Sequence, residues 1–153
     1  MRAINHAVTG AVIGLTVTAP VAAIPLAFLS HYALDALPHY DDREKYPIGS
    51  DGFFVILIID SMLCLALVAL LFALNPNNWL LPSLCAFMAT SPDLMWVPKF
   101  LYARKTKSNE EPDHKNPFLR FHSKIQKNTG PKGISIELIW LLAGIYIIFL
   151  ISN

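Results

Sequence analysis

Residues 53–74 read FFVILIIDSMLCLALVALLFAL and decide the fold class, because these 22 residues hold one acidic or basic side chain, Asp60. Roughly 20 consecutive apolar residues let an α-helix cross a bilayer core. Residues 134–151 form a second such run, and residues 79–102 form a third that SPD interrupts at positions 91–93. The whole chain is 54% apolar and only 15% charged, well below the charge of most soluble domains. The sequence therefore predicts an all-α integral membrane protein.

The N-terminal apolar region, residues 3–37, is too long for one span and contains Pro20 and Pro25. Proline suits the first turn of a helix, so we expect two short helices with a turn just before Pro20. The expected architecture is a single transmembrane domain, residues 1–153, with about five transmembrane helices and one short amphipathic helix. The expected spans are residues 3–18, 20–37, 53–74, 79–98 and 134–151, with a cytoplasmic loop at 99–133.

The basic residues support this count through the positive-inside rule. With the N-terminus in the cytoplasm, all 12 lysines and arginines fall in cytoplasmic segments. A four-span arrangement would place Arg2 on the side opposite all the other basic residues. We therefore expect a protein of the cytoplasmic (inner) membrane of a prokaryote, with its N-terminus inside and its C-terminus outside. The net charge of +1 gives no reason to expect a nucleic-acid partner, and membrane lipids are the expected surroundings.

The second expected span ends in SHYALDALPHYDD, a stretch rich in side chains that can bind metal ions. His31 and Asp35 are four residues apart and share one helix face, as in helical metal motifs with two ligands. The proline after this pair ends the helix, which leaves His39 and Asp41 on a turn that can fold back over the same face. The alternative is an ordinary polar helix end at the membrane interface.

Three further candidate ligands come from other parts of the chain: His6, Asp93 and His122. His6 begins a helix face that continues with a Gly-x3-Gly pair, which allows close helix approach. Asp93 follows a proline inside an apolar run, and a charge at that depth usually faces a partner or a cavity. His122 lies on the apolar side of an amphipathic helix expected at residues 116–127. The expected topology puts all three at the cytoplasmic level, although glycine packing alone and simple coverage of apolar surface are the structural alternatives for His6 and His122.

The other roles follow from position and charge. Zinc suits a histidine-rich ligand set, and manganese or iron would also fit mixed histidine and carboxylate ligands. Glu137, one turn into the last span, and Asp41 are the candidates for a general base or acid. Lys99, Arg104 and Arg120 are basic residues at the same level that could hold an anionic headgroup. A phosphoester of a lipid is therefore the expected substrate class.

The N-terminal NHAVTGAVIG, followed by His/Asp motifs after short apolar helices, resembles a family of membrane-bound metal-dependent hydrolases. This family includes the LexA-binding, inner-membrane-associated hydrolases. The resemblance is best over residues 1–42 and looser at Asp93 and His122, and PHYD and FHS stand where the family has Pro-Asp-x-Asp and Thr-His-Ser. It implies a metal-binding set of His6, His31, Asp35, His39 and Asp41. HYALDALPH is also similar to the His-x3-Asp helix of zinc-dependent phospholipase C-like enzymes, and both resemblances imply metal-assisted hydrolysis.

The leading hypothesis is thus a membrane-embedded metal-dependent hydrolase with its site at the cytoplasmic interface. One alternative is a small ion-coupled transporter in which Asp60, Asp93 and Glu137 relay protons or bind a cation. The other is a non-catalytic membrane scaffold that recruits a partner through residues 103–133. A transporter needs access from both faces, and the outer half of this chain has almost no polar residues, which weakens that alternative.

Overall fold

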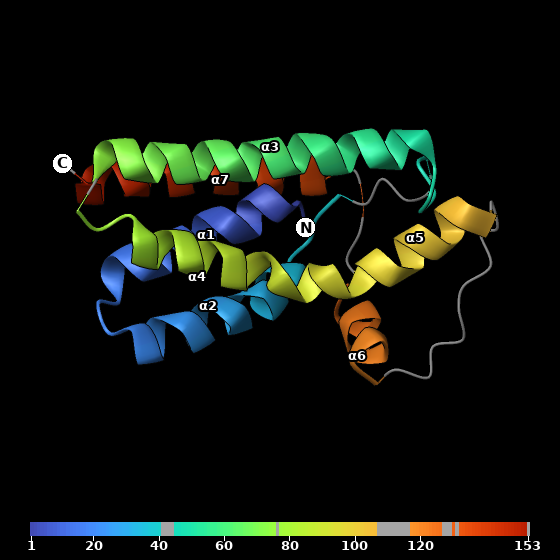
Figure 1. The fold of residues 1–153 in the computed structure, drawn as a ribbon, viewed down its shortest axis with the longest axis horizontal. Coiled ribbons are helices and arrows are strands. Elements are labelled where there is room, and N and C mark those ends of the chain that lie inside the picture. The colour runs from blue at the N-terminus through green and yellow to red at the C-terminus, as the bar shows by residue number, and fades with distance from the viewer. Residues whose placement is uncertain (41–44, 76, 107–116, 127–129, 131, 153) are drawn as a thin grey trace.

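The structure, a computed structural model, describes residues 1–40, 45–75, 77–106, 117–126, 130 and 132–152, and among these residues it contains helices and no strands. The predicted all-α class is confirmed for these residues (Figure 1). The helices are α1 (Ala3–Thr16), α2 (Pro20–Asp35), α3 (Asp51–Leu74), α4 (Leu80–Thr90), the 3₁₀ helix η1 (Ser91–Trp96), α5 (Val97–Thr106), α6 (Pro117–Ile125) and α7 (Gly133–Ser152).

Three helical segments are long and apolar enough to cross a membrane: α3, the run Leu80–Thr106 that joins α4, η1 and α5, and α7. Large apolar side chains cover their outer surfaces; Met62 is 65% exposed and Ile139 is 66% exposed, as expected for helices surrounded by lipid. These features support a membrane protein. The count of five spans is not confirmed, because α1 and α2 have 14 and 16 residues and reach only about 21 and 24 Å of a core roughly 30 Å thick.

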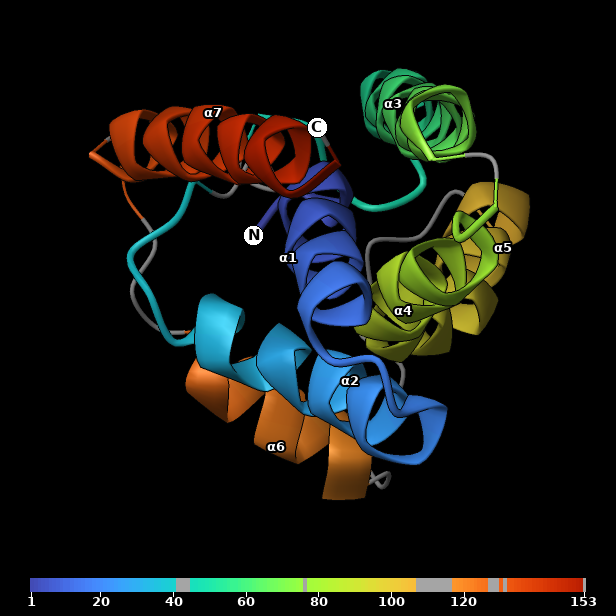
Figure 2. The same ribbon diagram turned by 90° about the vertical axis from the view of Figure 1, so that its left-hand side faces the viewer.

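Helix α1 is the centre of the bundle. Figure 2 shows it surrounded by α2, α4 and α7, and α3 also contacts it. Val8 and Ala11 of α1 are fully buried and pack in one core cluster with Leu67 of α3 and Ile148 of α7. The N-terminal end of α1, the C-terminal end of α2 and η1 meet beside this core, as contacts of Asp35 with Met1 and of His31 with Asp93 show, and the candidate ligands lie there.

The Gly-x3-Gly face of α1 packs against α4. A Cβ atom added to Gly10 would collide with the carbonyl oxygen of Cys85, and one added to Gly14 would lie 2.5 Å from the Cα atom of Pro82. The glycines thus allow the backbones of α1 and α4 to touch. His6, at the N-terminal end of the same face, contacts α2, because its ring stacks on that of His31. Close helix approach was the expected role of this face, but its partner is α4.

We expect Gly10→Ala to destabilise the bundle. Alanine is the better helix former by about 1 kcal/mol, but here its methyl group meets backbone atoms that cannot turn aside. Overpacking of this kind costs about 1–3 kcal/mol, so thermal unfolding in detergent should begin several degrees lower. Gly130→Ala, where an added Cβ meets nothing within 4 Å, is the control. An unchanged melting temperature for Gly10→Ala would show that α1 and α4 are not packed this closely.

The fourth expected span differs from the observed helices in its bounds and its regularity. The helical run continues to Thr106 rather than ending at residue 98, so the segment expected to be a cytoplasmic loop begins as helix. Pro92 lacks the N–H that an α-helix would pair with the Met88 carbonyl, and the Ser91 hydroxyl donates to that carbonyl instead (2.8 Å). The chain tightens into η1 at this point, which turns Asp93 toward α2 and α6.

Candidate metal centre

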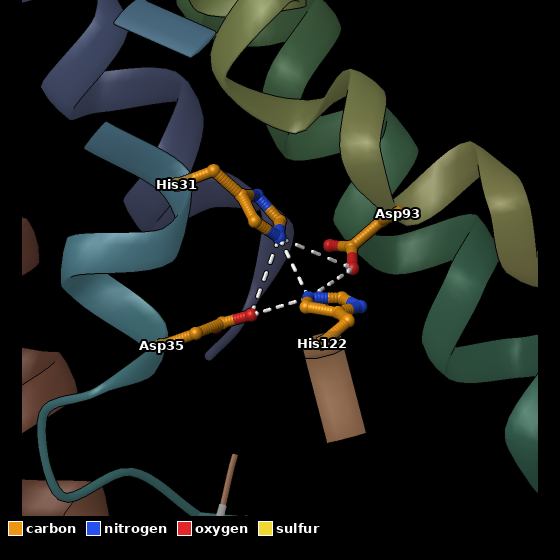
Figure 3. A group of neighbouring side chains, drawn as sticks. All are labelled: His31, Asp35, Asp93 and His122. Atoms are coloured by element: carbon orange, nitrogen blue, oxygen red, sulfur yellow. Dashed lines mark hydrogen bonds and ion pairs between the residues drawn. The ribbon is translucent and has the colours of Figure 1, made fainter. Parts of the chain in front are cut away.

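Four of the predicted ligands come together: His31 and Asp35 from α2, Asp93 from η1 and His122 from α6 (Figure 3). Each offers one ligand atom, and these atoms all lie within 4.8 Å of one another. His122 Nε2 lies 2.7 Å from Asp35 Oδ2 and 3.0 Å from His31 Nε2. His31 Nε2 lies 3.2 Å from Asp35 Oδ2 and 3.7 Å from Asp93 Oδ1. This group could hold a metal ion.

The spacing of these atoms suits a small divalent cation. Nitrogen and oxygen ligands bind zinc at about 2.0–2.2 Å in a tetrahedral arrangement, so neighbouring ligand atoms are then roughly 3.3–3.6 Å apart. The distances above, together with 4.0 Å from His122 Nε2 to Asp93 Oδ1, lie on both sides of that value. Only small side-chain adjustments would therefore separate a four-ligand zinc shell from the observed arrangement.

The group is buried on all but one side. The side chains of His31, Asp35 and His122 are fully buried, whereas that of Asp93 is 34% exposed. A buried carboxylate is costly unless charged or polar groups compensate it. Asp35 is compensated by the imidazoles, by the Gln126 amide, which donates to Oδ2 at 2.9 Å, and by the Met1 amino nitrogen at 2.8 Å from Oδ1.

A backbone carbonyl sets the tautomer of His31. Its Nδ1 lies 2.8 Å from the carbonyl oxygen of Ala89, which can only accept, so Nδ1 carries the proton and Nε2 presents a lone pair to the group. A metal-binding histidine usually makes this same kind of contact through its second nitrogen. A 3₁₀ turn would pair the Ala89 carbonyl with the nitrogen of residue 92, which is proline and has no proton to give.

Two residues that the sequence analysis did not single out support the group. Trp96 Nε1 donates to His122 Nδ1 (3.2 Å), so neutral His122 carries its proton on Nε2 and donates it to Asp35; binding a metal through Nε2 would require that proton to leave. Gln126 donates to Asp35 from one helical turn beyond His122. Their spacing was the available signal: Trp96 is three residues after Asp93, and Gln126 is four after His122. Residues at these spacings lie on the same side of a helix.

His6 lies beside this group without being one of its four members. Its ring stacks on that of His31, with the ring centroids 4.1 Å apart. His6 Nε2 lies 3.2 Å from Asp35 Oδ1, out of line for a hydrogen bond, so both nitrogens of this fully buried ring lack a hydrogen-bond partner in the described part of the chain. An unpaired buried nitrogen is costly, so His6 remains a candidate for a further ligand.

Two predicted residues near the group take other partners. His39 is buried but outside the four-residue group, and its Nδ1 lies 2.9 Å from the Leu37 carbonyl oxygen, a contact made within the turn itself. Glu137 accepts a hydrogen bond from the Tyr40 backbone N–H (3.2 Å) and lines a separate small cavity. The turn after α2 therefore folds onto α7, not back over the α2 face as expected. Asp41 lies outside the described residues.

The three basic residues proposed to hold a headgroup are dispersed. Lys99 Nζ lies 5.2 Å from the centre of the Trp96 ring, and Trp96 in turn hydrogen-bonds His122. Arg104 packs over the Phe54 ring and pairs with Asp51 at 3.4 Å, so it holds the start of α3. Arg120 is exposed on α6.

The chain matches no family model, no curated protein and no solved structure. Function must therefore be inferred from the side chains. Three of the four residues are buried among helices rich in apolar side chains, and ionisable groups in such surroundings usually serve a function.

Proposed function

We propose that His31, Asp35, Asp93 and His122 bind a divalent metal ion and that the protein is a membrane-embedded metal-dependent hydrolase. The convergence of four ligand atoms from three separate elements within 4.8 Å carries the proposal. Zinc is the preferred metal because two imidazoles and two carboxylates suit it, and manganese or iron is also compatible. His6 would serve as a further ligand through its nearby Nε2.

The proposed chemistry is activation of water. A bound divalent ion lowers the pKa of a coordinated water from about 16 toward 7 and polarises the group to be cleaved. Asp93, the partly exposed member, marks the side from which water and substrate would approach. A zinc ion can take a fifth ligand, so a water would join the four side chains, and the Asp93 carboxylate oxygen that does not hold the ion would accept the proton of that water. The earlier candidates Glu137 and Asp41 are not needed for this step.

The proposed substrate is a phosphoester of a lipid, reached from the cytoplasmic interface of a prokaryotic inner membrane. The proposed orientation, N-terminus in and C-terminus out, rests on the placement of the basic residues. Lys99 is the best supported headgroup contact, because it packs on Trp96 beside His122. Arg120 is a second, from the exposed side of α6, whereas Arg104 is engaged with Asp51.

Metal analysis of detergent-purified protein tests the proposal. After reloading with zinc and removal of excess, we expect stoichiometric metal in the wild type and a large loss in His31→Gln. His39→Gln is the matched control, because His39 is buried in the same region but lies outside the group. Wild-type protein that holds no metal after reloading with zinc, manganese or iron would refute the metal site.

Hydrolysis is tested separately. Metal-loaded wild type should release phosphate or alcohol from a lipid phosphoester in mixed micelles, and His31→Gln should not. If the protein binds stoichiometric metal but hydrolyses neither phosphomonoester nor phosphodiester lipids, the metal site stands and the proposed substrate class is wrong.

A further inference from the structure

A cavity of about 690 Å³ lies between α1, α3 and the α4–η1–α5 run. Ligand pockets are typically about 300–1,000 Å³, so it is large enough for part of a lipid. Asp93 lines this cavity and is also the exposed member of the four-residue group. Trp96, which holds His122, lines it as well. The cavity therefore adjoins the proposed metal site at Asp93.

The lining of the cavity is polar in one region and apolar beside it. Asp93, Arg2 and Asp60 form the polar region, where Arg2 and Asp60 approach to 3.9 Å. Apolar residues of α3 line the cavity on both sides of Asp60, from Phe53 to Val68. A molecule with a polar head and an apolar tail matches the polar region together with the apolar lining beside it.

One face of α3 forms the long wall of the cavity. Leu57, Ser61, Cys64 and Val68 all line it, and their spacing of three or four residues places them on one side of the helix. The 12 residues from Leu57 to Val68 extend roughly 16 Å at the helical rise of 1.5 Å per residue. The wall is therefore long enough to run beside an extended hydrocarbon chain.

We propose that this cavity binds an acyl chain of the lipid substrate, with the tail along α3 toward Val68 and the scissile group beside Asp93. This assignment rests on the proposed function and adds where the substrate lies. The chain can enter sideways from the membrane, because the helices that form the cavity carry exposed apolar surfaces. The acyl tail moves from the apolar bilayer into an apolar cavity, so the hydrophobic effect does not favour the cavity over the bilayer. Packing against the cavity wall and the polar contacts of the head provide that preference.

Photolabelling with a defined lipid tests the proposal. Phosphatidic acid with a diazirine near the end of one acyl chain is incorporated into phosphatidylcholine vesicles that contain the zinc-loaded protein, and labelled residues are located by mass spectrometry. We expect labels on the cavity faces of α3 and α4, around Cys64–Val68 and Ser83–Phe87. Labels spread evenly over outward residues such as Ile59 and Met62 would mean surrounding lipid only and would overturn the proposal.

Two neighbouring residues of α3 provide a matched pair of variants. Ser61 lines the cavity, whereas Met62 is 65% exposed and does not line it. Ser61→Phe should reduce labelling of the far end of the cavity several-fold, and Met62→Phe should leave it unchanged. Equal labelling in both variants would contradict the assignment. Val68→Phe shortens the far end only, so it should weaken labelling by long acyl chains more than by short ones.

Failure of this proposal can be distinguished from failure of the proposed function. Metal content is measured on every variant, and Ser61→Phe and Met62→Phe should both keep wild-type zinc. If the protein holds zinc and hydrolyses short-chain substrates but labelling is uniform, the acyl-chain site is wrong and the hydrolase proposal stands. If labelling is confined to the cavity but no metal binds, the acyl-chain site stands as a lipid site and the hydrolase proposal fails.

Discussion

Replacing Asp35 with asparagine is expected to remove metal binding and, with it, any hydrolytic activity. Asp35 is the residue that contacts most of the other candidate ligands: Oδ2 faces His31 and His122, and Oδ1 faces His6. Asparagine removes the negative charge. It can also place an NH₂ group where Asp35 Oδ2 now faces the Nε2 atoms of His31 and His122. Loss of a residue that only orients a ligand costs about 10–100-fold in affinity, so we expect a loss of more than about 100-fold here.

Isothermal titration with zinc, in the presence of a competing chelator, measures this loss. Asp60→Asn is the control, because it removes another carboxylate from a membrane helix but leaves the four-residue group complete. Circular dichroism checks that Asp35→Asn keeps its helical content. Asp35→Glu is a second variant, which keeps the negative charge but moves the carboxylate by one methylene group. Wild-type zinc affinity in Asp35→Asn would exclude Asp35 as a ligand.

The sequence could locate much of the candidate site because the relevant constraints are coarse. The apolar runs and the basic residues predict which helix ends share a membrane level, and they do so without using any histidine or acidic residue. His31 and Asp35 are related by helical spacing alone. Asp93 is predicted as a ligand from its membrane level, and His122 from its membrane level and its helix face. The structure places both beside His31 and Asp35.

The remaining details depend on rotations that apolar patterning does not specify. A lipid-facing helix is apolar all round, so its sequence does not tell which side faces a partner. The Gly-x3-Gly face could equally have met α2 or α4, and carbonyl contacts at Cys85 show that it meets α4. His39 and Glu137 are expected at the same membrane level as the ligands, but the contact of His39 with Leu37 and that of Glu137 with Tyr40 hold them outside the group.

Helix length explains why the number of spans remains open. Pro20 predicts the break between α1 and α2 correctly, since α2 begins there, whereas Pro25 lies inside α2 without ending it. The apolar pattern does not reveal that α1 ends at Thr16, short of the length that crosses a bilayer alone. Trp96 and Gln126 could have been suggested by their spacing from Asp93 and His122, but only the structure shows that their side chains reach the group.

Metal loading is expected to slow hydrogen exchange in α6 more than in any other helix. With 9 residues, α6 is too short to be stable alone, because isolated helices below about 12 residues are marginal in water. Its described contacts with α2 and η1 are concentrated at the site: His122 and Gln126 reach Asp35, Trp96 holds the His122 ring, and the Phe121 and Tyr32 rings lie 5.6 Å apart. An ion bound by His122 therefore adds directly to the docking of α6.

The size of this effect follows from linkage. An ion that binds fully only when α6 is docked stabilises the docked state by RT ln(1 + [metal]/Kd), about 2.7 kcal/mol at 100 times Kd, which corresponds to roughly 100-fold slower exchange. Exchange mass spectrometry of peptides from residues 117–125, with and without zinc, measures it. Peptides from α7 serve as the internal control, and His122→Ala should abolish the zinc effect without changing the α7 peptides. Zinc that protects α7 as strongly as α6 would show that the ion is bound elsewhere in the bundle.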